Sequence, residues 1–396
     1  MLNIPENRTY LESHPWIDFQ LDVSQATYIL WMLLGESRSK CEHIAGVPLS
    51  PERARTLYNV YLSKGVHATT SIEGNTLTER QVRQLLEGSL KLPLSQKYLA
   101  DEVQNIIEAC NEIAKETLED SSSPISVERI CRFNELVLRG LEPGEDVVPG
   151  QVRTHEVGVL RYRGAPWKDC RYLLDRLCDW LNSGFNTHEP DTKFALLLFK
   201  AIMAHLYLAW IHPFGDGNGR TARLLEFQIL IQSGVPFPAA QLLSNHYNTT
   251  RTRYYVELDK SSKSPLGVNS FIQYAVQGFV DGLREQIEFI RNQQIEVTWE
   301  NFVHQEFRGK DSIAKTRQKH LILAMTDEAR PQAELADLTP EIIRAYASRG
   351  EKTLTRDLNA LVGMGLVLKK KDHYAANRAK ILAFLPPQIK DSASPP

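Results

Sequence analysis

The sequence HPFGDGNGRTAR, at positions 212–223, brings several kinds of reactive and charge-binding group into one short stretch. Its three glycines and its asparagine suit positive φ angles that turn successive backbone N–H groups toward one point, which makes an anion-binding nest. A helix predicted in the segment after Gly219, with Gly234 as its stop, directs the positive end of its dipole to the same point. The stretch is therefore typical of a phosphate site.

Four side chains of this stretch add chemistry to the nest. Arg220 and Arg223 are spaced i, i+3 on the first helical turn, so both can clamp phosphate oxygens. Asp216 offers the kind of oxygen that Mg²⁺ takes beside phosphates, and a neutral His212 could accept a proton from an attacking hydroxyl. A plain glycine-rich turn, with His212 capping the preceding helix, is the alternative, and it leaves the two arginines and the aspartate unexplained.

Positions 212–223 match the signature HxFx[DE]GNGRxxR at every specified position, and the chain here resembles the Fic family. The resemblance implies a mainly α enzyme, a Fic-type helical bundle with a β-hairpin flap, that uses ATP and Mg²⁺. It would transfer AMP to a Ser, Thr or Tyr hydroxyl of a target protein and of itself. The resemblance makes His212 the general base and Phe214 a core anchor, and makes Asp216 the Mg²⁺ ligand. It assigns ATP binding to Asp216, Gly217, Asn218, Gly219, Arg220, Thr221, Ala222 and Arg223.

A second motif lies upstream, where Thr69, Glu73 and Gly74 fit the pattern [ST]xxxE[GN]. Taken alone, Glu73 followed by glycine is a common helix C-terminus. In the Fic family this pattern is inhibitory, and the resemblance implies that Glu73 forms a bidentate pair with Arg223. That pair would withhold the arginine from the γ-phosphate and keep the enzyme idle until it opens.

Residues 157–162 are rich in β-branched side chains and predict a short strand or hairpin in an otherwise helical protein. The alternatives are a surface hairpin and an edge that binds an extended peptide as a further strand. In Fic proteins this place is the flap that aligns the target hydroxyl, and it follows a GxxR element that Gly150 and Arg153 match. The sequence at 163–166, RGAP, departs from the double proline of many relatives. The flap residues expected at the ATP site are Val157, Gly158, Val159 and Leu160.

Further along, Tyr254 and Tyr255 could pack on an adenine ring, although aromatic residues at helical spacing are more often part of a core. By resemblance this region closes the nucleotide pocket, with Ser262 where some relatives place an asparagine. His205 lies about two helical turns before the loop, and we interpret it as a core histidine rather than a second base.

The chain of 396 residues predicts an N-terminal helical region with the inhibitory motif over 1–120, a Fic catalytic core over 121–307 and a winged helix-turn-helix domain over 313–390. Residues 313–396 hold 14 Lys and Arg against 9 Asp and Glu, a net charge of +5. That excess favours DNA contact by the last domain. The alternative is a domain used for protein contacts or dimerisation. The expected DNA contacts are Arg349, Lys352, Arg356, Lys369, Lys370 and Lys371.

Composition sets further bounds. The net charge of −2 gives no overall nucleic-acid signature, and five scattered cysteines without CxxC spacing predict a reducing cytoplasm. We expect no membrane partner, because the apolar stretch 194–211 contains Lys200 and His205 and leads directly into the loop. A homodimer is compatible with the sequence. Two other functions stay open: a DNA-binding regulator whose Fic domain senses nucleotide, and a Fic enzyme that removes AMP from its target or transfers another phosphate-linked group.

Overall fold

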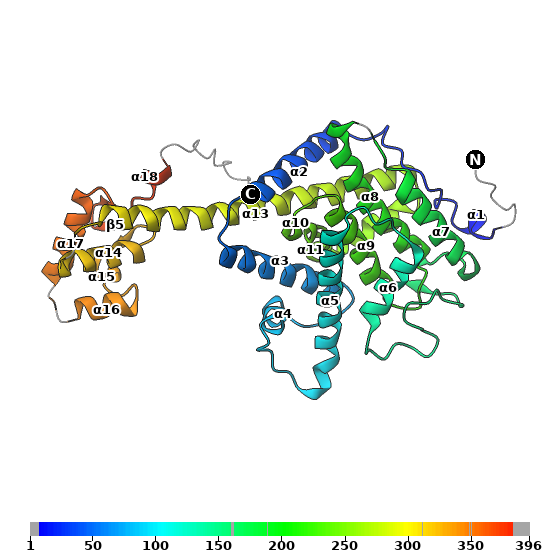
Figure 1. Ribbon diagram of the computed structural model, residues 1–396, viewed down its shortest axis with the longest axis horizontal. Coiled ribbons are helices and arrows are strands. Elements are labelled where there is room, and N and C mark those ends of the chain that lie inside the picture. Colours follow the sequence, from blue (N-terminus) through cyan, green and yellow to red (C-terminus); the bar gives the residue numbers. More distant parts are fainter. Residues whose placement is uncertain are drawn as a thin grey trace. The chain divides into compact units, whose positions relative to one another are not determined.

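The computed structural model describes residues 8–159, 162–187, 189–310, 312–347, 349 and 351–382. They form a mainly α protein, as predicted (Figure 1). The chain divides into two compact units, Met1–Ile287 and Glu288–Pro396, and the division falls inside one long helix.

The first unit is a helical bundle with one small hairpin. Its elements are α1 (Tyr10–Ser13), α2 (Tyr28–Gly46), α3 (Pro51–Ile72), α4 (Glu79–Leu86), a 3₁₀ turn (Leu94–Gln96), α5 (Lys97–Glu119), α6 (Val127–Leu138), β1 (Gly158–Val159), β2 (Tyr162–Arg163), α7 (Trp167–Ser183), α8 (Pro190–Ile211), α9 (Asn218–Gln232), α10 (Phe237–Ala240), α11 (Leu242–Thr249), α12 (Arg251–Ser261) and the first part of α13 (Pro265–Glu306), the helix in which the division falls.

Helices α8 and α9 form the centre of this bundle and carry the two ends of the predicted phosphate stretch. α8 packs against α2, α7 and α9, while α9 also contacts α3, α5 and α6 (Figure 1). A proline in the first turn starts α8. Gly234, the stop predicted from the sequence, follows the end of α9 at φ 81°. Because both helices are held by neighbours on several sides, the loop between them has fixed ends.

Among the described residues, the segment Thr192–Ile211 alone is long and apolar enough to span a bilayer. Of its most apolar stretch, 67% is buried inside the bundle, as in the core helix of a soluble protein. The segment is therefore packed as a core helix, which agrees with the interpretation of this apolar stretch from the sequence.

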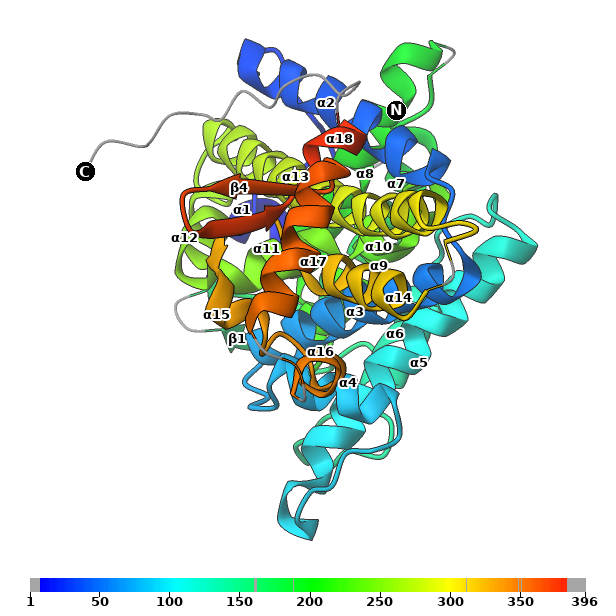
Figure 2. The same ribbon diagram turned by 90° about the vertical axis from the view of Figure 1, so that its left-hand side faces the viewer.

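The second unit combines short helices with a small antiparallel sheet. Its elements are α14 (Ile313–Ala324), β3 (Arg330–Pro331), α15 (Gln332–Leu335), α16 (Pro340–Tyr346), α17 (Glu351–Gly363), β4 (Val367–Lys370), β5 (His373–Ala376) and α18 (Ala379–Leu382). The strand order is β3-β5-β4, with Val367 opposite Ala376 and Arg330 opposite Tyr374. Figure 2 shows α17 beside β4, which it contacts.

The core of the second unit begins earlier in the chain than the predicted boundary at 307. Trp299, Val303 and Phe307, in and just after the last turns of α13, are buried together with Leu321, Leu358 and other residues of the following elements. Since these side chains complete the second core, the last turns of α13 belong to this unit rather than to the first unit.

Candidate active site

His212 stands at the end of α8 in the left-handed conformation, with φ 50° and ψ 57°. Its backbone N–H donates to Leu208 O at 3.0 Å, and Nδ1 lies 3.4 Å from Ala209 O. Because a carbonyl only accepts, this contact puts the ring proton on Nδ1 and leaves Nε2 as the proton acceptor. Burial lowers the pKa of His212 to about 4, so the imidazole is neutral at pH 7.

Arg153 fixes the backbone around His212. Its Nε donates to His212 O at 2.8 Å and its Nη1 to His155 O at 2.6 Å, while Nη2 donates to Ala165 O. Its backbone N–H bonds Pro213 O at 2.9 Å. A fully buried side chain therefore ties both ends of the flap to the loop between α8 and α9, a role that the GxxR resemblance did not specify.

The flap is the hairpin of β1 and β2, in which Gly158 pairs with Arg163 and Val159 with Tyr162. Its second strand is anchored to α8, because the Tyr162 hydroxyl donates to Trp210 O at 2.8 Å. At the position where the sequence departs from a double proline, a Cβ on Gly164 would lie 2.9 Å from both His212 Cβ and Arg153 Nη2. This crowding explains a glycine there. Leu160, expected at the ATP site, lies outside the described residues.

The loop between α8 and α9 is shaped by buried amide groups. Asn218 Oδ1 accepts from Phe214 N–H at 2.9 Å and its Nδ2 donates to Phe214 O at 2.8 Å, so its side chain closes the loop. Phe214 is fully buried, which confirms it as an anchor. Of the residues expected to favour positive φ, only Gly217 adopts it, at 75°, since Asn218 and Gly219 already form the first turn of α9.

Asn134 of α6 supports the same loop and was missed in the sequence. Fully buried, it donates from Nδ2 to Asp216 O at 2.8 Å and accepts Gly150 N–H on Oδ1 at 3.0 Å. It thus links the loop to the segment that leads into the flap. The signal was a lone amide among the apolar residues of that helix, because a buried amide must find partners.

Arg223 and Glu73 meet at the N-terminus of α9. Arg223, 2% exposed, donates from Nη2 to Glu73 Oε1 at 2.5 Å and to Thr69 O at 3.0 Å. The pair joins one nitrogen to one oxygen, and so is not the bidentate pair expected. Burial by itself raises the pKa of Glu73, but Arg223 and then Arg220 outweigh it, so the pKa lies below its usual value and the carboxylate is ionised.

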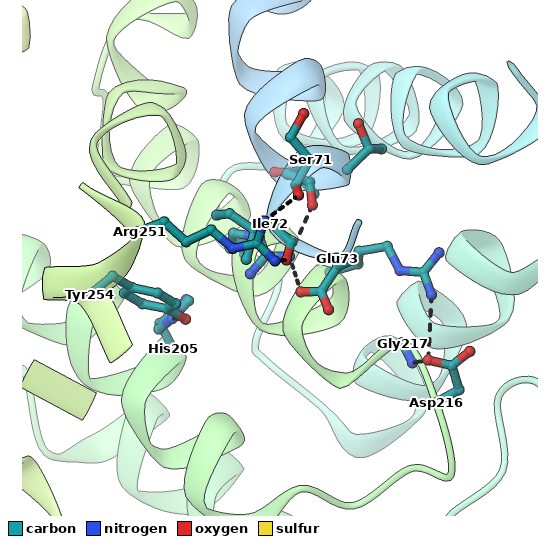
Figure 3. Close-up of polar contacts among 12 residues, drawn as sticks. Ser71, Ile72, Glu73, His205, Asp216, Gly217, Arg251 and Tyr254 are labelled. Atoms are coloured by element: carbon teal, nitrogen blue, oxygen red, sulfur yellow. Dashed lines mark hydrogen bonds and ion pairs between the residues drawn. The ribbon is translucent and has the colours of Figure 1, made fainter. Parts of the chain in front are cut away.

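The Glu73 carboxylate lies directly on the predicted nest. A Cβ placed on Gly219 would be 2.2 Å from Glu73 Oε1, so any larger residue at 219 would collide with it. Figure 3 shows Glu73 at the end of α3, with Asp216 and Gly217 of the loop nearby. A carboxylate of this chain therefore occupies the place where helix geometry favours an anion.

The end of α3 is held by a second arginine. Arg251 of α12 donates from Nη1 to Ser71 O at 3.2 Å and from Nη2 to Ile72 O at 2.6 Å (Figure 3). Its positive charge faces the carbonyls of the last turn, at the negative end of the helix. This contact accounts for the tolerance of Glu73 at a helix C-terminus.

Arg220 lies between two carboxylates. Its Nη1 is 3.4 Å from Glu102 Oε1 and its Nη2 is 3.5 Å from Asp216 Oδ1, both long contacts. Its side chain is 6% exposed, and its Nε, like that of Arg223, is buried without a partner among the described residues. Both arginines therefore retain a donor for a further acceptor.

A buried polar cluster lies behind Arg223. His205 Nε2 is 2.9 Å from the Tyr254 hydroxyl, and the Tyr247 hydroxyl donates to Glu226 Oε1 at 2.9 Å. Burial lowers the pKa of His205 to about 3 and raises that of Glu226 to about 8, so both groups are neutral at pH 7. The 3.8 Å approach of His205 to Glu226 is thus not an ion pair.

The residues expected around the adenine differ in their environment. Tyr254 is 3% exposed and bonded to His205, so it belongs to the core, which was the alternative reading of this residue. Tyr255 and Ser262 are half-buried on and just after α12. Thr221 and Ala222 are buried in α9, and Thr221 already bonds Gly217 O through its backbone N–H.

Three comparisons identify relatives of this architecture. Residues 124–230 match the model of the Fic/DOC family. The chain is 29% identical over 262 residues to protein adenylyltransferase fic-1 of Caenorhabditis elegans, covering 64% of this chain and 47% of that one. With protein adenylyltransferase Fic of Nematostella vectensis it shares 30% identity over 203 residues, 51% of this chain and 44% of that one. The chain thus spans less than half the length of these relatives.

Solved structures agree with this relationship. Fic-1 from C. elegans superimposes with a TM-score of 0.52 at 26% identity, over 67% of this chain and 74% of that one. A Fic family protein from Desulfovibrio desulfuricans shares the fold, with a TM-score of 0.50 at 21% identity over 89% of this chain and 96% of that one. Residues 124–230 therefore match the Fic/DOC family model, and the fold of the first unit is similar to that of these Fic proteins.

Proposed function

We propose that this chain is a protein adenylyltransferase that moves AMP from ATP to a Ser, Thr or Tyr hydroxyl of a target protein and of itself. The observation that carries the proposal is the Glu73–Arg223 pair, seated on Gly219 at the start of α9 beside His212. The site has the chemistry of a phosphate cradle, and a carboxylate of the chain fills it. The similar proteins of C. elegans and N. vectensis are called protein adenylyltransferases.

The nucleotide would bind with its phosphates at the N-terminus of α9. Arg220 and Arg223, each with a buried Nε that lacks a partner among the described residues, would donate to phosphate oxygens. Asp216 would hold Mg²⁺: its side chain is 51% exposed, and one loop carboxylate suits an ion that takes most of its ligands from phosphates and water. Bound there, Mg²⁺ would neutralise charge on the departing pyrophosphate.

His212 would accept the proton of the target hydroxyl on Nε2. The hydroxyl oxygen would attack the α-phosphorus, and the bond from that phosphorus to the pyrophosphate oxygen would break. An imidazole that is neutral at pH 7 is in the correct state for this step. The flap, tied to His212 through Arg153, would align the hydroxyl with that nitrogen.

Glu73 would set the resting state. While its carboxylate holds Arg223, the γ-phosphate lacks its arginine and ATP binds unproductively. Opening of the pair would release the arginine and bring the α-phosphorus into line, so activity would follow the fraction of molecules in which the pair is open.

The test is incubation with ATP labelled at either the α- or the γ-phosphate. We expect only the α-label on protein, more of it with Glu73→Gly, and none above background with His212→Ala. Transfer of the γ-label would make the site a kinase. No label from either ATP, in a Glu73→Gly protein that binds ATP, would favour nucleotide sensing. Loss of AMP from a pre-labelled target in a manner dependent on Glu73 would favour the reverse reaction.

We further propose that the second unit is a winged helix that binds DNA. Asp357 on the buried side of α17 accepts from Arg317 Nε at 2.6 Å, Gln318 Nε2 at 2.8 Å and the Tyr346 hydroxyl at 3.0 Å, which fixes the helix. All six expected DNA contacts are exposed: Arg349, Lys352 and Arg356 lie on or before α17, and Lys369, Lys370 and Lys371 lie at the β4–β5 turn.

Salt titration of duplex binding tests this second proposal. Replacing the three lysines at 369–371 by alanine should lower the slope of log affinity against log salt by about 0.9 for each lost phosphate contact. Asp372→Ala, which removes a negative charge from the same turn, should strengthen binding. No salt-sensitive binding by the intact protein would assign the unit to protein contacts or dimerisation.

A further inference from the structure

We propose that Glu102 of α5 is a positioning residue that couples the inhibitory segment, residues 69–77, to the phosphate loop, residues 212–223. The effect of this coupling on activity rests on the proposed function. The experiment that tests the coupling does not, because it measures no activity. Its basis is one carboxylate with two partners: Glu102 Oε2 accepts Asn75 Nδ2 at 2.8 Å, and Glu102 Oε1 lies 3.4 Å from Arg220 Nη1.

On one side, Asn75 sets where the chain goes after Glu73. Its side chain donates to Leu99 O at 2.9 Å as well as to Glu102, and its Oδ1 accepts Leu77 N–H at 3.0 Å. Its backbone N–H returns to Thr70 O at 3.1 Å. Asn75 is 6% exposed and follows Gly74, which turns the chain at φ 101°. The inhibitory segment is thus clamped to α5 immediately beyond Glu73.

On the other side, Glu102 helps to place an arginine that has no close partner. The two contacts of Arg220 are both long, and its buried Nε is unpaired among the described residues. Asp216, the other carboxylate near it, belongs to the phosphate loop itself. Glu102 comes from outside the loop and also holds the inhibitory segment. Movement of Asn75 therefore changes how the negative charge of the Glu102 carboxylate is shared between Asn75 and Arg220.

The two arginines of the loop are therefore restrained through connected contacts. Glu73 holds Arg223 directly, and Glu102 relates the next part of the same segment to Arg220. Withdrawal of the segment would free Arg223 and, by releasing Glu102 Oε2 from Asn75, let Arg220 and Glu102 rearrange together. Both phosphate ligands would then become available in one event rather than two.

The test is amide hydrogen exchange of the intact chain without nucleotide, so its outcome is independent of any activity. In Glu102→Gln an NH₂ group replaces one carboxylate oxygen, so the side chain can no longer accept from Asn75 and Arg220 through two separate oxygens. We expect about fivefold faster exchange at 73–77, the change that loss of one hydrogen bond of about 1 kcal/mol gives, and altered exchange at 215–220. The matched control is Glu112→Gln on the same helix, which bridges Arg129 and Arg132 with a side chain 28% exposed, against 22% for Glu102.

The decisive variant is Asn75→Ala. Coupling predicts that it alters exchange of the phosphate loop in the wild-type background and no longer does so in a Glu102→Gln background. If Asn75→Ala changes only its own segment, or changes the phosphate loop equally in both backgrounds, the coupling is wrong. Should Asn75→Ala fail to fold, Glu102→Gln decides: a change at both segments, with none for Glu112→Gln, supports coupling, and a change at neither or at one overturns it.

Discussion

The phosphate loop and the inhibitory segment meet at one ion pair, but they are held in opposite ways. The loop is held by buried amides: Asn218 closes it on Phe214, and the fully buried Asn134 supports it from α6. The inhibitory segment also has a buried amide, Asn75, but the groups at the end of α3 reach water, since the Glu73 side chain is 35% exposed and Arg251 is exposed.

This difference teaches which side of the pair moves. Breaking a buried hydrogen bond leaves an unsatisfied polar group and costs about 1–3 kcal/mol. The Glu73 carboxylate, in contrast, can regain water when it leaves the buried Arg223, because its side chain is already 35% exposed. Under the proposed function, the loop is the preorganised side of the pair, and the segment that fills it is the side expected to withdraw.

The largest effect is expected at His212, the side chain of the loop that is neutral at pH 7 and can take up a proton. His212→Ala should lower AMP transfer by about 10²–10⁴-fold, the usual cost of losing a general base. ATP affinity, measured by calorimetry, should change little because the arginines and the nest remain. Undiminished transfer would remove His212 from the mechanism and leave the loop as a binding site alone.

Asn134→Ala should come next, because it strips a buried support from the rigid side. The free energy of unfolding should fall by about 1–3 kcal/mol as the Asp216 carbonyl and Gly150 N–H lose their partner. Thermal unfolding measures this directly. A stability equal to that of wild type would mean that the loop is not held by its buried amides, which would undo the contrast drawn above.

Arg251→Ala should raise activity, whereas His212→Ala lowers it, and its effect should be smaller. Losing a cation at the end of α3 costs about 0.3–1 kcal/mol, so the segment should open more often and transfer should rise by up to about fivefold. Arg253→Ala is the control: it removes an arginine of the same helix that lies over the Tyr274 ring, 5.0 Å from its centre. Equal rates for both variants would show that Arg251 does not restrain the segment.

The smallest expected change is with pH. The pKa of His212 is lowered to about 4 and that of Glu73 lies below its usual value, so neither group changes charge between pH 8 and pH 6. The kcat/KM of Glu73→Gly for its target, and its ratio to wild type, should stay level over that range. A fall with an apparent pKa near 6.5 would mean that His212 titrates as an ordinary, solvated imidazole.

The sequence alone was sufficient for groups that are contiguous in the chain. Positions 212–223 predicted the loop and the helix that follows it, because spacing along a turn and a helix fixes which groups converge. The role of Phe214 as an anchor came from the family resemblance. The role proposed for Glu73 could be found only through a family motif, since nothing local shows that it meets Arg223. That pairing depends on how α3 packs against α9.

The missed residues come from other helices. Asn134, Glu102 and Arg251 lie on α6, α5 and α12, and no spacing along the chain reports that they converge. Tyr254 was placed at the nucleotide, but its hydroxyl is used by His205 in the core. The domain boundary was put after 307, because an uninterrupted helix pattern does not show that Trp299 packs in a different core.

One measurement tests the central claim most directly: self-labelling by α-labelled ATP in Glu73→Gly, compared with wild type and with the double variant Glu73→Gly, Arg223→Ala. The account predicts up to about a tenfold gain for the single variant, which a shift of about 1.4 kcal/mol gives, and no gain for the double variant. The matched control is Glu87→Gly at the end of α4, where a glutamate C-cap is likewise followed by a glycine at positive φ. Equal labelling by wild type and Glu73→Gly, both folded and at saturating ATP, or an equal gain with Glu87→Gly, would contradict the claim that Glu73 withholds Arg223.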